Sequence, residues 1–169
     1  MLKSKYTIKN KEQALSGIKN HIKSCIRYSS SLKKPNDCDY SAIQRRNKKD
    51  SIEIIQKAYN NGINFYDTAR FYTDSEEKLG ASLNEVRENV IIATKTGAEN
   101  AEDFWKDLET SLKNLQTDYV EIYQFHNPPF CPKPNDGSGL YEAMLEAKDE
   151  GKIKHIGITS HKFTIAKQA

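Results

Sequence analysis

Residues 50–169 alternate between two hydrophobic periods. Short segments rich in apolar residues lie at four places, residues 63–66, 90–94, 119–125 and 153–158, and the one at 90–94 is continuously apolar. The segments around these runs place apolar residues at every third or fourth position, over residues 50–61, 75–86, 101–115 and 139–150. The short segments are typical of strands, that at 90–94 of a parallel strand covered on both faces, and the longer segments are typical of amphipathic helices. Strand and helix therefore alternate four times.

This alternation predicts a sheet of parallel strands joined by right-handed βαβ crossovers. Four such strands fit either an open doubly wound sheet or part of a closed (β/α)8 barrel, and the hydrophobic pattern leaves both open. A complete barrel needs roughly 200 residues or more. The chain has 169 residues, so we expect a partial barrel if the fold is of that kind.

The first 49 residues follow a different pattern. Residues 11–28 place apolar side chains at helical spacing beside a lysine-rich face, which predicts an amphipathic helix. Residues 29–41 are polar and contain Pro35, which is typical of a linker. We therefore divide the chain into a basic helical extension with its linker, residues 1–49, and a barrel-type domain, residues 50–169.

Charge is distributed unevenly between these two parts. Residues 1–49 hold 13 Lys/Arg against 3 Asp/Glu, a net charge of +10, and residues 50–169 hold 13 against 20, a net charge of −7. The basic part is an appended segment, an arm for nucleic acid or an acidic partner, or a segment that docks on its own acidic domain. It carries no known nucleic-acid motif and only Tyr6, Tyr28 and Tyr40 as aromatic residues, which argues against nucleic acid.

Cysteine usage and hydropathy exclude several classes of protein. The three cysteines are widely spaced and form no C-x-x-C pair, so the sequence indicates neither a disulfide framework nor a metal site. No apolar run approaches the roughly 18 residues of a membrane span. The start lacks the apolar core of a secretory signal, although its basic, acid-poor character leaves an organellar transit peptide open. We expect a cytoplasmic protein with no membrane partner.

Four chemically active side chains follow the predicted strands. Asp67 comes directly after the first strand, with Tyr72 five residues later, and Lys95 and His126 follow the second and third strands. Right-handed connections place the carboxyl ends of these strands on the same side of the sheet. We therefore expect an acid, a phenol, an ammonium and an imidazole to converge there.

These four groups suit the reduction of a carbonyl. A tyrosine, with an ordinary pKa near 10, becomes a better proton donor when a lysine cation favours its phenolate. An aspartate can hold that lysine, and a histidine can donate a second hydrogen bond to the carbonyl oxygen. Taken singly, each residue has an ordinary structural explanation: Asp67 as a turn residue, Tyr72 as packing, and Lys95 and His126 as surface or loop residues.

Local motifs favour the catalytic interpretation. The sequence from Gly62 to Leu83, GINFYDTARFYTDSEEKLGASL, resembles the aldo-keto reductase signature, with Ser75 as the expected N-cap of the helix that follows. Ile-Ala-Thr-Lys95 and Tyr-Gln-Phe-His126 resemble the next two strand ends of that family. The resemblance implies strands two to five of a TIM barrel. It also implies a catalytic tetrad of Asp67, Tyr72, Lys95 and His126, with Tyr72 as general acid.

The same resemblance implies a nicotinamide cofactor, NADP or NAD. The segment Gly157-Ile-Thr-Ser160-His161 is similar to the family's G-x-S-N segment, which makes Ser160 and His161, together with Asp67, the expected cofactor-binding residues. His161 stands where asparagine is commoner, and the alternative role of Ser160 is a helix cap. The family's phosphate-binding strands have no counterpart here and no other phosphate loop is present, so we expect an incomplete cofactor site.

Two functions follow from this sequence. The first is an NADPH- or NADH-dependent reductase of small aldehydes or ketones. The second is a truncated, catalytically inactive relative that acts as a scaffold or partner subunit. Four strands of a barrel leave two unpaired edges, which also suggests self-association through the sheet edges.

Overall fold

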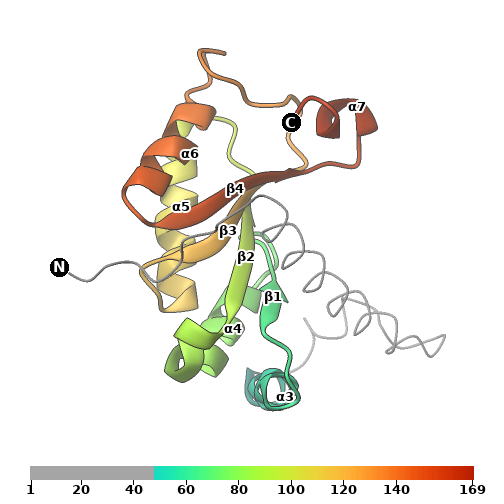
Figure 1. Ribbon diagram of the computed structural model, residues 1–169, viewed down its shortest axis with the longest axis vertical. Helices are drawn as coiled ribbons and strands as arrows, with labels where there is room; N and C mark the ends of the chain where they lie inside the picture. The colour runs from blue at the N-terminus through green and yellow to red at the C-terminus, as the bar shows by residue number, and fades with distance from the viewer. Residues whose placement is uncertain (1–47) are drawn as a thin grey trace, which may run out of the picture. The chain divides into compact units, whose positions relative to one another are not determined.

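The computed structural model describes residues 48–169, and the predicted helix at residues 11–28 and its linker lie outside them. Helices and strands alternate along the described part (Figure 1). The helices are α3 (Lys48–Asn60), α4 (Ser75–Leu83), η1 (Asn84–Asn89, 3-10), α5 (Ala101–Leu115), α6 (Leu140–Asp149) and α7 (Phe163–Ala166). The strands are β1 (Phe65–Asp67), β2 (Ile91–Thr96), β3 (Val120–His126) and β4 (Ile153–Thr159).

The strand order distinguishes the two architectures that the hydrophobic pattern left open. All neighbouring strands are parallel, and they follow one another in chain order, β1-β2-β3-β4. A doubly wound sheet reverses its strand order at a switch point, whereas a barrel adds each new strand beside the last one. The prediction of a partial barrel with four βα units is confirmed.

Each boundary agrees with the sequence prediction to within about three residues, but the start of α4 corrects one residue role. Ser75 was expected at the N-cap, and instead it is the first residue of the helix, after Asp74. Its hydroxyl accepts a hydrogen bond from Thr68 Oγ1 at 2.8 Å. The Ser-Glu sequence is typical of a helix start, which is why Ser75 was predicted as the N-cap. In the structure its hydroxyl bonds Thr68, just after β1, instead of a backbone N–H of the helix.

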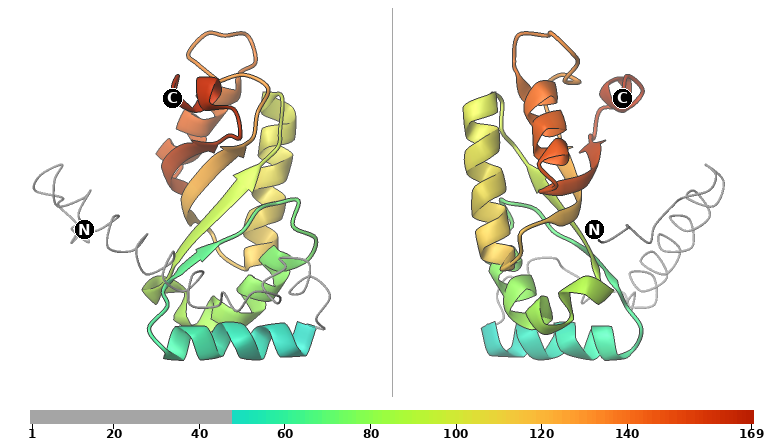
Figure 2. Two further views of the ribbon diagram at one scale, coloured as in Figure 1. Left: turned by 90° about the vertical axis from the view of Figure 1, so that its right-hand side faces the viewer. Right: turned by 60° about the vertical axis from the view of Figure 1, so that its left-hand side comes forward.

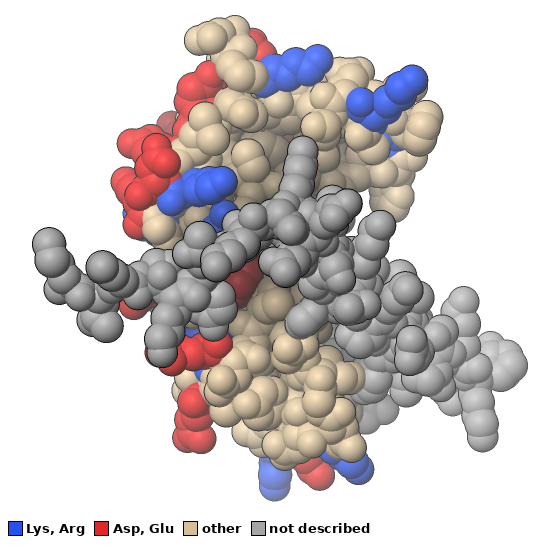
Figure 3. Space-filling view, viewed as in Figure 1, with Lys and Arg blue, Asp and Glu red and all other residues tan. Residues whose placement is uncertain are grey.

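Helices α5 and α6 lie side by side on one face of the sheet (Figure 2). The rings of Phe104 and Tyr123 meet edge-on with centroids 5.6 Å apart, and both side chains are fully buried. Burying large apolar side chains such as these supplies much of the free energy of folding. The outer side of these helices is acidic (Figure 3), with exposed carboxylates at Glu102, Asp103, Glu109, Glu142, Glu146 and Asp149.

The opposite face of the sheet is the one that would line a barrel. Strand side chains alternate between faces, and Tyr123 lies on the helix side. Its neighbours Gln124 and Ile122 therefore belong to the opposite face, and strand register pairs Gln124 with Lys95 on β2. Asp67 pairs in register with Ala93, which lies two residues before Lys95 on β2, so Asp67 shares this face. Three of the predicted catalytic residues, Asp67, Lys95 and His126, therefore lie on the inner face.

A charged network closes the amino-terminal edge of the sheet. The guanidinium of Arg87 contacts Glu121 at 2.9 Å and the carbonyl oxygen of Tyr119 at 2.8 Å, and it is 91% buried by side-chain area. Glu121 also accepts the backbone N–H of Ile92 at 2.9 Å. Lys154 of β4 contacts the same carboxylate at 3.1 Å. One carboxylate thus joins β2, β3 and β4 where they begin.

Gly80 gives a test of helix packing. A Cβ placed at this position would collide with the carbonyl oxygen of Asn114 and lie 2.7 Å from the carbonyl carbon of Leu115. Alanine has the higher helix propensity by about 1 kcal/mol. Because backbone blocks the methyl group, we expect Gly80→Ala to lower the free energy of unfolding, by roughly 1–3 kcal/mol in urea titration.

Glu77→Ala, at an exposed position of the same helix, is the control and should change stability by less than about 0.5 kcal/mol. A Gly80→Ala protein as stable as the parent would show that α4 and α5 do not pack this closely.

Candidate active site

The ion pair between Asp67 and Lys95 joins the carboxyl ends of β1 and β2. Lys95 Nζ lies 2.6 Å from Asp67 Oδ2 and donates a second hydrogen bond to the carbonyl oxygen of Thr68 at 2.7 Å. The Lys95 side chain is only 6% exposed, whereas that of Asp67 is 45% exposed. A buried ammonium is tolerated only with such partners, so Asp67 and Thr68 offset its desolvation.

Tyr72 is carried by the loop from β1 to α4. Two backbone hydrogen bonds continue the β1–β2 ladder into this loop, from Thr68 N to Ala93 O and from Arg70 N to Lys95 O. A turn closed by Tyr72 N and Ala69 O at 3.0 Å follows. It places the Tyr72 ring over the lysine, with Nζ 5.4 Å from the ring centroid. The loop therefore brings the phenol to the ion pair.

His126 completes the group from the end of β3. Its ring meets the Tyr72 ring edge-on, with centroids 5.9 Å apart and an interplanar angle of 88°. Its Nδ1 lies 3.1 Å from the hydroxyl oxygen of Thr159, on β4. Four consecutive strands thus meet at this edge, and the structure places the four predicted catalytic side chains in one chain of contacts.

The electrostatics of the site differ from the sequence expectation at Tyr72. Burial and then the negative charge of Asp67 raise the pKa of the phenol above its ordinary value of 10, whereas we expected Lys95 to lower it. The ammonium of Lys95 lies against Asp67 and the carbonyl oxygen of Thr68, while burial of the phenol and the Asp67 carboxylate set the direction of the shift. Tyr72 is therefore protonated at neutral pH.

The pKa of His126 moves in the other direction. Burial of the ring, the ammonium of Lys95 and the neighbouring His161 lower it below 6.5, and Asp67 opposes this shift. The imidazole is therefore neutral near pH 7, with a proton on one ring nitrogen only.

Two of the three residues expected to bind the cofactor, Ser160 and His161, lie beyond the end of β4, at the same edge. Ser160 Oγ accepts the backbone N–H of Lys162 at 3.1 Å, a local turn contact. The N-cap of α7 is Lys162 and no side chain caps it, so the alternative role of Ser160 as a helix cap is wrong. The backbone N–H of His161 donates to the side-chain oxygen of Asn127 at 3.2 Å, and His161 is exposed. Neither residue makes a hydrogen bond to the four catalytic candidates in the part of the chain that the structure describes.

Thr159 is the one site residue that the sequence analysis missed. It precedes Ser160 and pairs in register with His126, so strand alternation alone places both side chains on the inner face. The sequence signal that could have identified Thr159 was a polar residue at the last inner-facing position of the fourth predicted strand.

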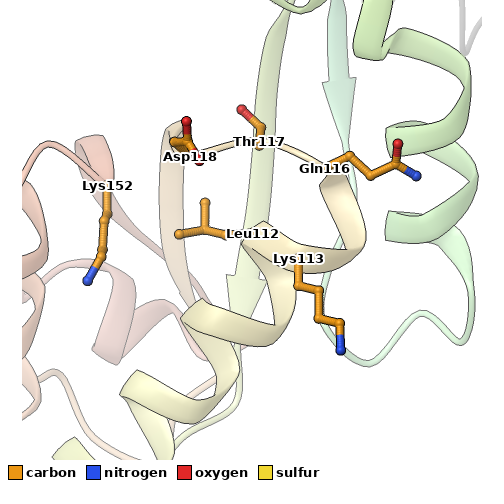
Figure 4. A pocket seen from close by; sticks show the side chains of 6 residues that line it. All are labelled: Leu112, Lys113, Gln116, Thr117, Asp118 and Lys152. Atoms are coloured by element: carbon orange, nitrogen blue, oxygen red, sulfur yellow. The ribbon is translucent and has the colours of Figure 1, made fainter.

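One hollow on the surface lies away from these residues. Figure 4 shows an open depression of about 460 Å³ at the end of α5 and the start of β3, lined by Leu112, Lys113, Gln116, Thr117, Asp118 and Lys152. It belongs to the amino-terminal edge of the sheet, opposite the four catalytic candidates. Residues 48–169 contain no group of three or more side chains suited to hold a metal ion, and none of their helices is long and apolar enough to cross a membrane.

Comparison with known proteins identifies relatives of this chain. The model of the aldo/keto reductase family matches residues 38–169. The chain is 38% identical over 128 residues to aldo-keto reductase YhdN of Bacillus subtilis, covering 67% of this chain and 38% of that protein. It is 36% identical over 121 residues to L-galactose dehydrogenase of Arabidopsis thaliana, covering 65% of this chain and 38% of that protein.

A solved structure gives the same result. The aldo-keto reductase of Klebsiella pneumoniae in complex with NADPH superposes with a TM-score of 0.62 and 25% identity, covering 70% of this chain and 42% of that one. The chain therefore spans less than half the length of each of these three proteins.

The Asp67–Lys95 pair can be tested by its contribution to stability. Asp67→Asn removes the counter-charge of a buried ammonium, so we expect the free energy of unfolding to fall by about 1–3 kcal/mol, a range reduced from the fully buried case because Asp67 is half exposed. Urea titration at neutral pH measures the change.

Glu102→Gln is the matched control, since Glu102 contacts Lys106 at 2.7 Å with both side chains exposed. It should cost less than about 0.5 kcal/mol. Equal effects of the two substitutions would contradict the assigned role of Asp67.

Proposed function

The chain belongs to the aldo/keto reductase family, and we propose that it reduces the carbonyl group of a small aldehyde or ketone by hydride transfer from NADPH or NADH. The observation that carries the proposal is the contact chain from Asp67 through Lys95 and Tyr72 to His126. It joins a proton donor, a buried cation and a second hydrogen-bonding group at the edge where βα folds place their chemistry.

Tyr72 is the proposed general acid. Reduction adds a hydride to the carbonyl carbon, and the oxygen then needs a proton, which the phenol of Tyr72 supplies to give the alcohol. The raised pKa keeps this proton in place until negative charge develops beside it. The nearby ammonium of Lys95 then stabilises the phenolate that forms, and water returns the proton.

Asp67 and His126 support this step in different ways. Asp67 holds Lys95 in one position and balances its charge in the resting protein. His126 is neutral and lies edge-on to Tyr72, where a ring N–H can donate to the same substrate oxygen. Two donors aimed at one oxygen would orient the carbonyl for attack on one face.

A reduced nicotinamide, when bound, supplies the hydride. The residues at this edge fit its polar end: Asp67 is 45% exposed, and Ser160 and His161 lie beyond the end of β4. The sequence of the described part contains no glycine-rich phosphate loop. We propose that residues 48–169 supply the nicotinamide end of the site and that the phosphate end needs further structure.

Whether the phosphate end of the cofactor site is supplied decides between the active reductase and the inactive alternative. Strands β1 and β4 each pair with a single neighbour within the described residues. Covering these edges, by self-association or by further strands, would complete the site. A chain that binds no dinucleotide would instead be a catalytically inactive partner subunit or scaffold.

Replacement of Tyr72 tests the general acid. We expect Tyr72→Phe to lower kcat for aldehyde reduction by a factor of about 10²–10⁴, with NADPH affinity unchanged, because the ring stays and only the proton donor is lost. NADPH consumption with short aldehydes, and oxidation of L-galactose by NADP or NAD, are suitable assays, since one relative is a named L-galactose dehydrogenase.

Tyr119→Phe is the control, because Tyr119 lies at the opposite edge of the sheet and uses its ring to contact Arg87 and Lys154. Turnover that survives in Tyr72→Phe would refute the assignment. Absence of turnover and of NADPH binding in the parent chain would favour the inactive alternative.

The pH dependence gives an independent test. Within residues 48–169 the titratable groups near Tyr72 include Asp67, Lys95 and His126, and the pKa of the phenol is raised above 10. Because the protonated phenol is the active form in reduction, kcat/KM should stay level through neutral pH and fall only above about pH 10. A rate that falls already between pH 7 and 9 would contradict the raised pKa.

A further inference from the structure

The loop that carries Tyr72 joins the end of β1 to the start of α4, and backbone hydrogen bonds fold it into two turns. Tyr72 N donates to the carbonyl oxygen of Ala69 at 3.0 Å, and Ser75 N donates to the carbonyl oxygen of Tyr72 at 2.9 Å. Between these bonds, Thr73 adopts the left-handed conformation, with φ of 47°. This conformation favours glycine, and it is strained for a β-branched side chain. The surrounding structure must therefore hold the turn that places Tyr72.

A hydrogen bond between two side chains closes this loop at its base. Thr68 Oγ1 donates to Ser75 Oγ at 2.8 Å, and Tyr72 lies on the loop between these two residues. Thr68 is fully buried, where a hydroxyl without a partner is costly. Ser75 is the first residue of α4, and its hydroxyl makes this tertiary contact instead of a local one at the helix start. The two ends of the loop are therefore tied directly to one another.

Each polar group of Thr68 contacts a different part of the site. Its backbone N–H donates to the carbonyl oxygen of Ala93 on β2 at 2.8 Å, and its carbonyl oxygen accepts from Lys95 Nζ at 2.7 Å. Its hydroxyl reaches Ser75 at the far end of the loop. One buried residue thus links the position of the ammonium to the position of the loop that carries the phenol.

We propose that the hydroxyl of Thr68, through its bond to Ser75, positions the ring of Tyr72 for proton transfer. Without this bond the strained turn is free to relax, and the phenol moves away from the ammonium and the imidazole that it contacts. The catalytic part of this proposal rests on the proposed function, because Thr68 acts on the reaction only through Tyr72. The position of the ring does not, because it belongs to the protein without substrate or cofactor.

The position of the ring is measured by NMR on the 169-residue chain without cofactor. The rings of Tyr72 and His126 meet edge-on with centroids 5.9 Å apart, which is close enough for a nuclear Overhauser signal between their ring protons. His126→Gln assigns this signal by removing it. We expect the signal to be lost in Thr68→Val, which keeps the shape of the side chain and removes the hydroxyl. Thr68→Ser retains the hydroxyl and should retain the signal.

Two further variants complete the measurement. Ser75→Ala removes the other partner of the bond and should lose the same signal, so the test does not depend on the folding of Thr68→Val. Thr110→Val is the matched control, because the Thr110 hydroxyl donates to the carbonyl oxygen of Lys106 at 2.7 Å at an exposed position on α5. It should leave the signal unchanged.

Kinetics then test the role in catalysis. We expect Thr68→Val and Ser75→Ala each to lower kcat for the carbonyl about tenfold, the effect of one lost hydrogen bond, with KM and NADPH affinity unchanged. Both substitutions break the same bond, so the double variant should also lose about tenfold in kcat, and not about a hundredfold. Thr68→Ser should stay within about twofold of the parent.

Three results would overturn the proposal. They are an unchanged ring signal in both Thr68→Val and Ser75→Ala, a loss of the signal in Thr68→Ser as large as that in Thr68→Val, and a double variant in which the two effects on kcat multiply. A parent chain with no turnover, whose variants change the ring signal as expected, would refute the proposed function and leave the positioning of Tyr72 standing.

Discussion

The burial of one ammonium group organises this end of the molecule. Lys95 lies at the end of a strand with almost no access to water, and its charge is compensated by Asp67 and the carbonyl oxygen of Thr68. Both partners belong to the end of β1 or the first residue after it, so satisfying the lysine also fixes the start of the loop that carries Tyr72. Stability and the proposed proton transfer therefore depend on the same ion pair, and the geometry of the phenol follows from the requirement that a buried cation be paired.

Burial and the Asp67 carboxylate also set the protonation of the phenol. Both raise the pKa of Tyr72 above its ordinary value. The proton is thus held until charge develops on a substrate. His126, with a lowered pKa, adds no positive charge that would compete with Lys95 near pH 7. The arrangement keeps one cation, one anion and two neutral donors in contact.

Periodicity and strand ends made much of this structure predictable. The helices and strands followed from hydrophobic spacing, and the convergence of the four polar side chains followed from the handedness of βαβ units. What could not be predicted depends on contacts between segments distant in sequence. Ser75 fits the local pattern of an N-cap, yet its hydroxyl bonds Thr68, and Thr159 gains its place only when β4 is in register with β3. The direction of the Tyr72 pKa shift depends on the burial of the phenol and on its distance from Asp67, which sequence spacing does not give.

The carboxylate of Glu121 has a consequence for how such a chain can change over evolutionary time. It ties three strands together at the end of the sheet farthest from Tyr72, through Arg87, Lys154 and the backbone of Ile92. Anchorage and chemistry are thereby assigned to separate rims. The loops around the proposed site can change in sequence and accept new substrates without disturbing Glu121. Substitutions at the opposite edge are constrained, because loss of Glu121 would remove contacts to three strands at once.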